Sequence, residues 1–279
     1  MTYFGFLAVF LVLPILALWA LAAYDRKRGV DVPPLMQSWP AWVIVLAHVV
    51  IAVVYTTPWD NYLVATRVWW YDPKLVTGLL IGYVPIEEYT FFVLQPLLTG
   101  AWLYFIARHM PVITPAPLYR VRVRVIGTVI LFFIWLVSVA ILVFGWRPGT
   151  YLGLLLGWAL PPLMIQSAFG ADILWRHRRM VILTIVPMTL YLAAADKLAI
   201  TSGTWTINPE QSVNILLLGR LPLEEFIFFF MTNTLIAVGI TLVSSMESKA
   251  RAERYLTAVR MWLTGKGNRT PLAVGENEA

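Results

Sequence analysis

The stretch GYVPIEEYTFF, residues 82–92, places two adjacent glutamates between a proline and a group of aromatic residues. Its surroundings are very apolar, because 59% of the 279 residues are hydrophobic and only 13% are charged. A second stretch, GRLPLEEFIFFF at residues 219–230, has the same order of proline, glutamate pair and aromatics. Two occurrences of so unusual a pattern indicate a shared role.

The composition is that of an integral membrane protein. The charged fraction is about half of the value usual for soluble domains, and the mean hydropathy is +0.74. The chain has no cysteine, which excludes disulfides, thiolate nucleophiles and cysteine-bound metal centres. Its three histidines lack the spacing of a metal-binding motif, so no metal is expected. The net charge of +6 favours membrane lipid over nucleic acid as the partner of the basic residues.

Seven apolar runs approach or exceed the length of about 20 residues that crosses a bilayer. They predict an all-α integral membrane protein with seven transmembrane helices. The runs cover residues 3–24, 40–56, 86–106, 125–145, 151–175, 181–195 and 223–245.

Basic residues concentrate after the first, third, fifth and seventh runs. Cytoplasmic loops are rich in Lys and Arg, so this distribution predicts an external N-terminus and a cytoplasmic C-terminus in the cytoplasmic membrane. The clusters include Arg26, Lys27, Arg28, Arg108, Arg120, Arg122, Arg124, Arg176, Arg178 and Arg179. The tail at 246–279 mixes basic and apolar residues, which predicts a cytoplasmic, amphipathic or disordered segment.

The chain contains an internal repeat. A shift of 136 residues brings Asp60 onto Asp196, and a shift of 137 brings Pro85 onto Pro222 together with the glutamates that follow. We therefore expect two parallel three-helix repeats, at 1–110 and 150–245, joined by a linker helix within 111–149. Two parallel repeats related by an axis along the membrane normal would hold equivalent residues at equal depth around one cavity.

The glutamate pairs have two structural readings. Pro85 and Pro222 suit the first position of a helix, and carboxylates in the next turn are stabilised by the helix dipole. Simple capping at the membrane surface is therefore one interpretation. The apolar segments at 75–84 and 213–218 favour another, in which short re-entrant half-helices precede the prolines and the glutamates lie inside the membrane. Carboxylates there face the bundle interior and are usually functional.

Paired carboxyl groups in a water-poor pocket can supply both an acid and a base. Aromatic faces stabilise cations, although packing or lipid contact would also explain such rings. Proton donation to an alkene, a shielded carbocation and proton removal together describe acid-catalysed olefin cyclisation. The candidate cation-stabilising residues are Tyr89, Phe92, Phe226 and Phe229.

The duplicated Pro-x-Glu-Glu motif, preceded by an Asp and a Trp and followed by Phe-Phe, resembles the membrane-integral lycopene cyclases in their fused form. The resemblance covers residues 1 to about 245 and implies cyclisation of the ψ end groups of lycopene to β-ionone rings. It implies an isomerase with no cofactor, an acyclic carotenoid substrate and other carotenoid enzymes as partners. The implied catalytic residues are Glu87, Glu88, Glu224 and Glu225, with Asp60, Asp196, Pro85 and Pro222 in support.

Within this resemblance, Glu87 or Glu224 is the expected acid, and Glu88 and Glu225 are the secondary partners. Asp60 and Asp196 are expected to brace the re-entrant segments, with the neighbouring Trp69 and Trp205 at the membrane interface.

Other functions remain open at the level of sequence. A carotenoid hydratase would use the same acid, and a proton-coupled transporter would also need intramembrane glutamates. A retinal photoreceptor needs a Schiff-base lysine in the last helix, and residues 223–245 contain none. A prenyltransferase would need spaced aspartates for magnesium diphosphate, which Asp60 and Asp72 match poorly.

Overall fold

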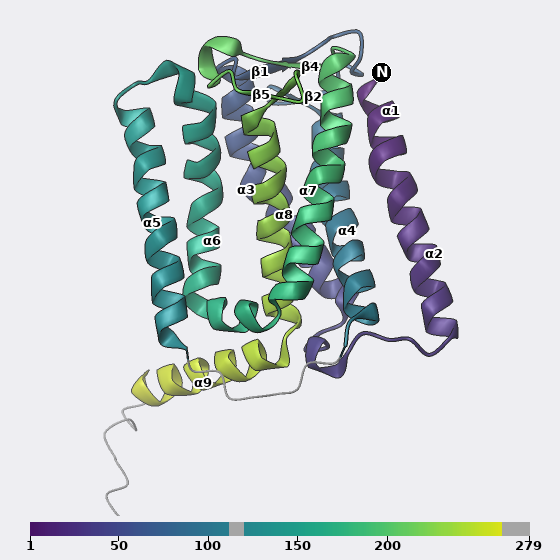
Figure 1. Ribbon diagram of the computed structural model, residues 1–279, viewed down its shortest axis with the longest axis vertical. Coiled ribbons are helices and arrows are strands. Elements are labelled where there is room, and N and C mark those ends of the chain that lie inside the picture. Colours follow the sequence, from purple (N-terminus) through teal and green to yellow (C-terminus); the bar gives the residue numbers. More distant parts are fainter. Residues whose placement is uncertain (112–119, 264–279) are drawn as a thin grey trace, which may run out of the picture.

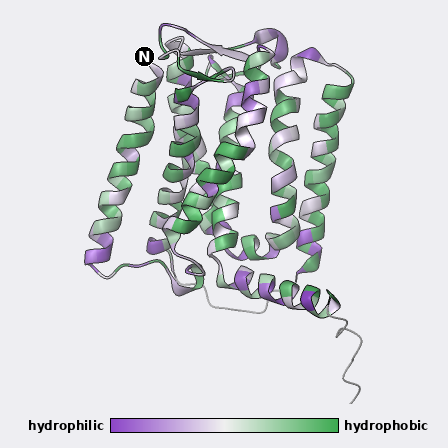
Figure 2. Ribbon diagram, turned by 180° about the vertical axis from the view of Figure 1, so that it is seen from behind, coloured by the Kyte–Doolittle hydropathy of each residue, from purple (hydrophilic) through white to green (hydrophobic). Residues whose placement is uncertain are grey.

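The computed structural model describes residues 1–111 and 120–263. Seven helices in these residues are long and apolar enough to cross a membrane, which confirms the predicted all-α membrane fold. The bundle is shown in Figure 1, and Figure 2 shows hydrophobic residues along the helices with hydrophilic residues gathered toward the two ends. The spans are Tyr3–Lys27, Pro34–Ala65, Ile86–His109, Val121–Val143, Arg147–Arg176, Arg178–Thr201 and Leu223–Ser244.

The first span consists of α1 (Tyr3–Leu7), the π-helical turn η1 (Ala8–Val12) and α2 (Leu13–Lys27), and the second of η2 (Pro34–Met36) and α3 (Ala41–Ala65). The third and fourth spans are α4 (Ile86–His109) and α5 (Val121–Val143). The last three are η3 (Arg147–Gly149) with α6 (Thr150–Arg176), α7 (Arg178–Thr201) and α8 (Leu223–Ser244). Helix α9 (Met246–Leu263) then runs across one end of the bundle (Figure 1).

Short strands lie at the other end of the bundle, beside the N-terminus (Figure 1). Strand β1 (Trp69–Tyr71) pairs antiparallel with β4 (Trp205–Ile207). Trp70 lies opposite Thr206, the residue 136 positions later in the chain. Equivalent strands of the two predicted repeats therefore pair with each other.

Each glutamate motif follows a hairpin. Strands β2 (Leu80–Ile81) and β3 (Val84–Pro85) are joined by a two-residue turn between Ile81 and Val84. Strands β5 (Leu216–Leu217) and β6 (Leu221–Pro222) are joined by a three-residue turn, since Leu217 pairs with Leu221. The extra residue in this turn explains why the repeat shift changes from 136 to 137.

These hairpins show that the predicted re-entrant half-helices were wrong. Gly82 has a φ of +69° in the first turn, and Leu218 and Gly219 have φ of +47° and +78° in the second. Left-handed residues of this kind belong to tight turns and end a right-handed helix. At Gly82 a Cβ atom would also lie 2.1 Å from Oδ1 of Asn61, so only glycine fits there.

The helices that carry the glutamates begin at Ile86 and Leu223, where the predicted spans begin. Pro85 is the N-cap of α4 and Pro222 is the N-cap of α8, rather than the first helical residue of each. Both glutamate pairs lie in the first helical turn, as expected. Free N–H groups and the helix dipole favour carboxyl groups at this position.

Four of the prolines in the helices are matched by aromatic donors from neighbouring helices. A proline lacks the N–H that would bond the carbonyl four residues earlier, and in a membrane another group must bond that carbonyl. The carbonyls four residues before Pro14, Pro161, Pro162 and Pro187 each accept a hydrogen bond from a tyrosine or tryptophan side chain. The pairs are Tyr191 Oη with Phe10 O at 3.0 Å, Trp135 Nε1 with Gly157 O at 3.3 Å, Tyr55 Oη with Trp158 O at 2.8 Å and Trp102 Nε1 with Leu183 O at 3.0 Å.

Ion pairs fasten α9 to the bundle. The Arg251 guanidinium donates two hydrogen bonds of 2.7 Å to the carboxylate of Asp172 in α6, and both side chains are buried. Arg176 also pairs with Glu247. Leu256 and Trp262 are exposed on α9, as expected for an amphipathic helix. Residues 264–279 of the predicted tail and residues 112–119 of the predicted linker lie outside the described part of the chain.

Candidate active site

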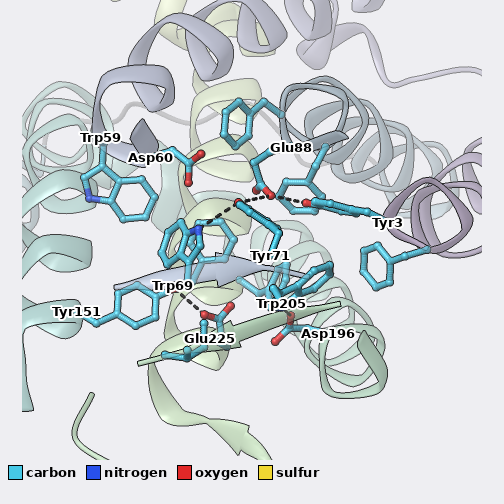
Figure 3. Close-up of a pocket in the computed structure, with 16 residues that line it drawn as sticks. Tyr3, Trp59, Asp60, Trp69, Tyr71, Glu88, Tyr151, Asp196, Trp205 and Glu225 are labelled. Atoms are coloured by element: carbon cyan, nitrogen blue, oxygen red, sulfur yellow. Dashed lines mark hydrogen bonds between the residues drawn. The ribbon is translucent and has the colours of Figure 1, made fainter. Parts of the chain in front are cut away.

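One cavity of about 40 Å³ lies at the end of the bundle that carries the strands. Helices α1, α3, α4, α6, α7 and α8 and the paired strands β1 and β4 all contribute to its walls. Its lining combines carboxyl groups, phenols and aromatic rings, as Figure 3 shows. The lining residues are Tyr3, Phe6, Trp59, Asp60, Trp69, Tyr71, Glu88, Phe91, Phe92, Tyr151, Asp196, Trp205, Ile207, Glu225, Phe228 and Phe229.

Four carboxyl groups from four helices converge on this cavity (Figure 3). Glu88 and Glu225 are the second glutamates of the two motifs, and Asp60 and Asp196 are the equivalent aspartates of α3 and α7. All four side chains are buried. The expected convergence of the two repeats on one interior site is therefore found for the second glutamate of each pair.

The first glutamate of each pair is directed elsewhere. Glu87 Oε1 accepts a hydrogen bond of 2.6 Å from the backbone N–H of Thr77, and Glu224 Oε1 accepts one of 2.7 Å from that of Val213. Ser212 donates a further bond of 3.0 Å to Glu224. Both side chains are buried but neither lines the cavity. They attach the loops before the hairpins to the starts of α4 and α8.

Two phenols donate to Glu88. The hydroxyl of Tyr3 lies 2.5 Å from Glu88 Oε2, and the hydroxyl of Tyr71 lies 3.0 Å from the same atom. Trp69 Nε1 donates to the oxygen of Tyr71 at 3.1 Å. Burial, followed by the charge of Glu88, raises the pKa of Tyr71 well above its ordinary value. Tyr71 therefore keeps its proton at neutral pH and remains a donor.

The second half of the site differs in its donors. Tyr151 donates to Glu225 Oε1 at 2.7 Å, in the same way that Tyr3 donates to Glu88. The position equivalent to Tyr71 is Ile207, which has no hydroxyl. The two halves therefore share the carboxyl groups of the repeat but not the full set of hydrogen bonds.

Within the described ranges, each of the two aspartates and each first glutamate of the two motifs has one buried oxygen without a hydrogen-bond partner. Trp205 Nε1 donates to Asp196 Oδ1 at 2.9 Å. Among the described residues, the Oδ2 atoms of Asp60 and Asp196 have no hydrogen-bond partner. Their side chains are each 1% exposed and face the cavity rather than re-entrant segments. Buried polar atoms without partners are uncommon and often belong to functional sites.

The motif tryptophans are buried over the cavity. Trp69 and Trp205 are 8% and 9% exposed, so their rings face the protein interior and not lipid. They lie in β1 and β4, and the pairing of these strands closes this end of the site. Trp69 also contacts the Tyr151 ring edge-on, with ring centres 5.3 Å apart.

Aromatic rings form much of the remaining wall. Of the four expected cation-stabilising residues, Phe92 and Phe229 line the cavity, whereas Tyr89 and Phe226 do not. Tyr89 instead donates its hydroxyl to Ile81 O at 3.1 Å and supports the first hairpin.

Several lining residues were missed by sequence reasoning. Tyr3 and Tyr151 are 148 residues apart, whereas the motifs follow shifts of 136 and 137. In the first repeat, the connection between α2 and α3 consists of Arg28 to Pro33, the short helix η2, and Gln37 to Pro40. In the second repeat, His177 alone separates α6 from α7. The extra loop length moves the first helix of each repeat out of register with the rest. A separate comparison of the first and fifth spans would have found the tyrosines. The other lining residues missed are Phe6, Trp59, Tyr71 and Ile207, whereas Phe91 and Phe228 belong to the aromatic groups that follow the two motifs.

The arrangement suits proton transfer to and from an apolar molecule. It offers several carboxyl groups for donating and accepting protons, and aromatic faces that stabilise a positive charge. Within the described ranges, no group of three or more His, Asp or Glu residues has the arrangement of a metal site.

A seven-helix membrane fold with an enclosed carboxyl and aromatic site defines a class of membrane protein suited to acid–base chemistry on hydrocarbons. The lycopene cyclase family model matches residues 36–106 and 148–244, and the chain belongs to this family. The matched regions include both glutamate motifs and both aspartates.

The names of similar proteins agree with this family. The chain is 36% identical over 254 residues to a lycopene beta-cyclase of Halobacterium salinarum, covering 90% of this chain and 99% of that protein. It is also 36% identical over 203 residues to a bifunctional lycopene cyclase/phytoene synthase of Podospora anserina, covering 70% of this chain and 34% of that protein. A similar bifunctional protein of Blakeslea trispora is 34% identical over 201 residues, covering 68% of this chain and 32% of that protein. No solved structure gave a significant match.

Proposed function

We propose that this chain is a lycopene β-cyclase that converts the acyclic ψ end groups of lycopene into β-ionone rings, giving γ-carotene and β-carotene. The observation that carries the proposal is the convergence of four carboxyl groups and an aromatic wall on one cavity, in a member of the lycopene cyclase family. The reaction is an isomerisation, since one proton is added and one is removed without net oxidation.

The proposed reaction has three steps. A carboxylic acid of the site adds its proton to C2 of the terminal double bond, and C1 becomes cationic. The electron pair of the C5–C6 double bond then forms the C1–C6 bond and leaves the positive charge at C5. A carboxylate removes the proton from C6, and those electrons form the C5–C6 double bond of the β ring. The protein gives one proton to the substrate in the first step and takes one back in the third, so its total number of protons is unchanged.

We assign the proton transfers to Glu88 and Glu225 rather than to Glu87 and Glu224. Glu88 and Glu225 line the cavity, whereas the first glutamates bind backbone N–H groups of the loops. Close carboxyl groups in a buried site share protons, so acid and base can coexist at neutral pH. Two phenols donate to Glu88 and favour its charged form, which suits the base. Glu225, with one phenol donor, is then the acid, and Asp60 and Asp196 support the exchange of protons.

The aromatic wall is proposed to protect the cation. Phe228 stacks parallel to Trp59 with ring centres 6.2 Å apart, and Phe91 lies 6.4 Å from Phe228. Ring faces stabilise a passing positive charge. A dry wall also prevents water from adding to the cation, which would give a hydrated product.

The orientation in the membrane is part of the same proposal. The end of the bundle that carries α9 is rich in arginine, which favours the cytoplasm for that end and an external N-terminus. The bifunctional names of the fungal relatives support contacts with other enzymes that act on carotenoids. Membrane lipid is the remaining partner.

Expression in a lycopene-accumulating bacterium that lacks a cyclase tests this function. The expected result is loss of lycopene and appearance of γ-carotene or β-carotene by chromatography. A double variant, Glu88→Gln with Glu225→Gln, serves as the matched control and should leave lycopene unchanged while still accumulating in the membrane. A hydroxylated acyclic product would identify a hydratase, and unchanged lycopene with the native chain would refute the proposal.

A further inference from the structure

A second hollow lies between α3 and α6 in the middle of the bundle. It has a volume of about 90 Å³, and α8 forms its floor. Its lining includes Ala52 and Tyr55 of α3, Trp158 and Pro162 of α6, and Thr232 and Leu235 of α8. A third and larger hollow, of about 560 Å³, lies further toward α9. Its lining includes Gln166 and Phe169 of α6, Gly239 and Leu242 of α8, and Ala252 and Leu256 of α9.

The two hollows continue the line of the active-site cavity along α8. Residues of this helix line the three spaces in turn, at the spacing of one helical face. They are Phe228 and Phe229, then Thr232, Leu235 and Ile236, and then Gly239, Leu242 and Val243. From residue 228 to residue 243 the face is about 22 Å long at about 1.5 Å per residue. We call the second and third hollows together the α3–α6 groove.

Lining residues of neighbouring spaces contact each other at two places. Trp59 of the active-site cavity stacks on Trp158 of the middle hollow, with ring centres 4.5 Å apart. Between the middle and the third hollow, Gln166 donates to Leu235 O at 3.2 Å. At the same level a Cβ atom on Gly239 would lie 2.4 Å from Nε2 of His48. Because Gly239 has no side chain, the His48 ring fits against α8 at this level.

The corresponding positions of the other repeat hold larger side chains. The residue 137 positions before Gly239 is Trp102, and the residue 136 positions after Ala52 is Met188. Trp102 extends to α7 and donates to Leu183 O, and Met188 is buried in the core. The repeats have therefore diverged so that small residues occur on the α3–α6 side.

We propose that the α3–α6 groove binds the linear polyene chain of an acyclic carotenoid while one end group occupies the active-site cavity. This rests on the proposed function, since it names where the rest of that substrate lies. The groove follows one face of α8 in line with the cavity, and most of the α8 residues that line it are apolar, which suits a rigid, extended hydrocarbon. A branched phospholipid would instead keep its head group at the membrane surface.

The groove has a consequence for the order of ring formation. Because it leads from the single cavity toward the opposite end of the bundle, the two end groups of one extended substrate cannot both reach the carboxyl groups. Only one ring is formed in each binding event. A bicyclic product requires the monocyclic intermediate to leave and return in the reverse orientation.

Ala52→Phe tests the proposal by filling the middle of the groove. Ala47→Phe is the matched control, because Ala47 is exposed on the same helix and does not line the groove. Both are made in a Glu88→Gln background so that binding is measured without turnover. The readout is the circular dichroism induced in the absorption bands of lycopene by the purified protein. We expect Ala52→Phe to weaken lycopene binding about tenfold, as overpacking of a fitted site does, and Ala47→Phe to leave it unchanged.

A short polyene with the same end group distinguishes the groove from the cavity. If its chain ends before Trp158, it should bind equally to both variants. Unchanged lycopene binding in Ala52→Phe would overturn the proposal, as would equal loss of the short and the long polyene. A third outcome would also overturn the proposal: phospholipid copurifies with the native chain, Ala52→Phe displaces it, and lycopene binding is unchanged. The groove would then be a lipid site. If the native chain forms no rings but its lycopene binding still depends on Ala52, the function fails and the groove stands.

Discussion

Tyr3 donates its hydroxyl proton to Glu88 across a distance of 2.5 Å, so the first turn of α1 contacts a carboxyl group of the active site that lies 85 residues later in the chain. Tyr151 makes the equivalent contact with Glu225 at 2.7 Å. The N-terminal turn is therefore part of the site, and its removal would expose one wall of the cavity.

We expect Tyr3→Phe to lower the rate of cyclisation more than it lowers the amount of folded protein. The substitution removes one of two donors to Glu88, and a hydrogen bond to a charged group is worth about 1.5–3 kcal/mol. This corresponds to a rate about tenfold to a hundredfold lower. Initial rates with lycopene in membranes, normalised to protein content, measure the effect. Tyr62→Phe, an exposed tyrosine of α3, is the control and should cyclise at the native rate.

The two glutamates of each motif should respond differently to the same substitution. Glu88→Gln and Glu225→Gln are each expected to lower turnover by about 10²–10⁴-fold, since each removes a proton-transfer group. Glu87→Gln and Glu224→Gln should retain most turnover, because the amide oxygen of Gln still accepts the backbone hydrogen bond. The four variants are compared by product formation per folded protein. Native turnover in Glu88→Gln together with loss in Glu87→Gln would reverse the assignment.

Tyr55 and Pro162 are expected to be energetically coupled. Tyr55→Phe leaves the Trp158 carbonyl without its donor, because Pro162 has no N–H, and should cost about 1–3 kcal/mol. In a Pro162→Ala background the alanine N–H can bond this carbonyl, so the same substitution should cost less. A double-mutant cycle of thermal unfolding in detergent measures the coupling, expected at about 1 kcal/mol. Additive effects would show that the proline and the tyrosine act independently.

His177 should make stability depend on pH. It lies between the spans formed by α6 and α7, and burial, with a smaller effect of the Arg176 charge, lowers its pKa to about 4. The unfolded value is about 6.5, so the unfolded chain binds a proton first as the pH falls. Stability due to His177 is complete above about pH 6.5 and is lost toward pH 4, by about 3 kcal/mol at most.

Comparison of the native chain with His177→Asn isolates this contribution. Glu247, 4.0 Å from His177, is a second titratable group nearby, and burial raises its pKa. The variant retains Glu247, so only the difference between the two unfolding curves reports on the histidine. A pH dependence of equal slope in both proteins would contradict the prediction.

The number and approximate positions of the spans could be read from the sequence because the bilayer imposes one length on every apolar helix. The repeat could also be read, since Asp60, Asp196 and the two motifs recur at nearly constant shifts. A carboxyl group in a membrane-spanning segment is costly in contact with lipid, so it faces the interior of the bundle. The sequence by itself therefore determined the fold class and the set of candidate acids.

Tertiary structure alone decided which glutamate of each pair lines the cavity. Glu87 and Glu88 are adjacent in one helical turn, and their side chains point about 100° apart. The backbone N–H of Thr77 donates to Glu87, whereas Tyr3 and Tyr71 donate to Glu88. Those partners come from separate segments of the chain, and no local pattern encodes their distance. The physical reason is that side-chain direction depends on long-range hydrogen bonds, whereas membrane insertion depends on local hydrophobicity.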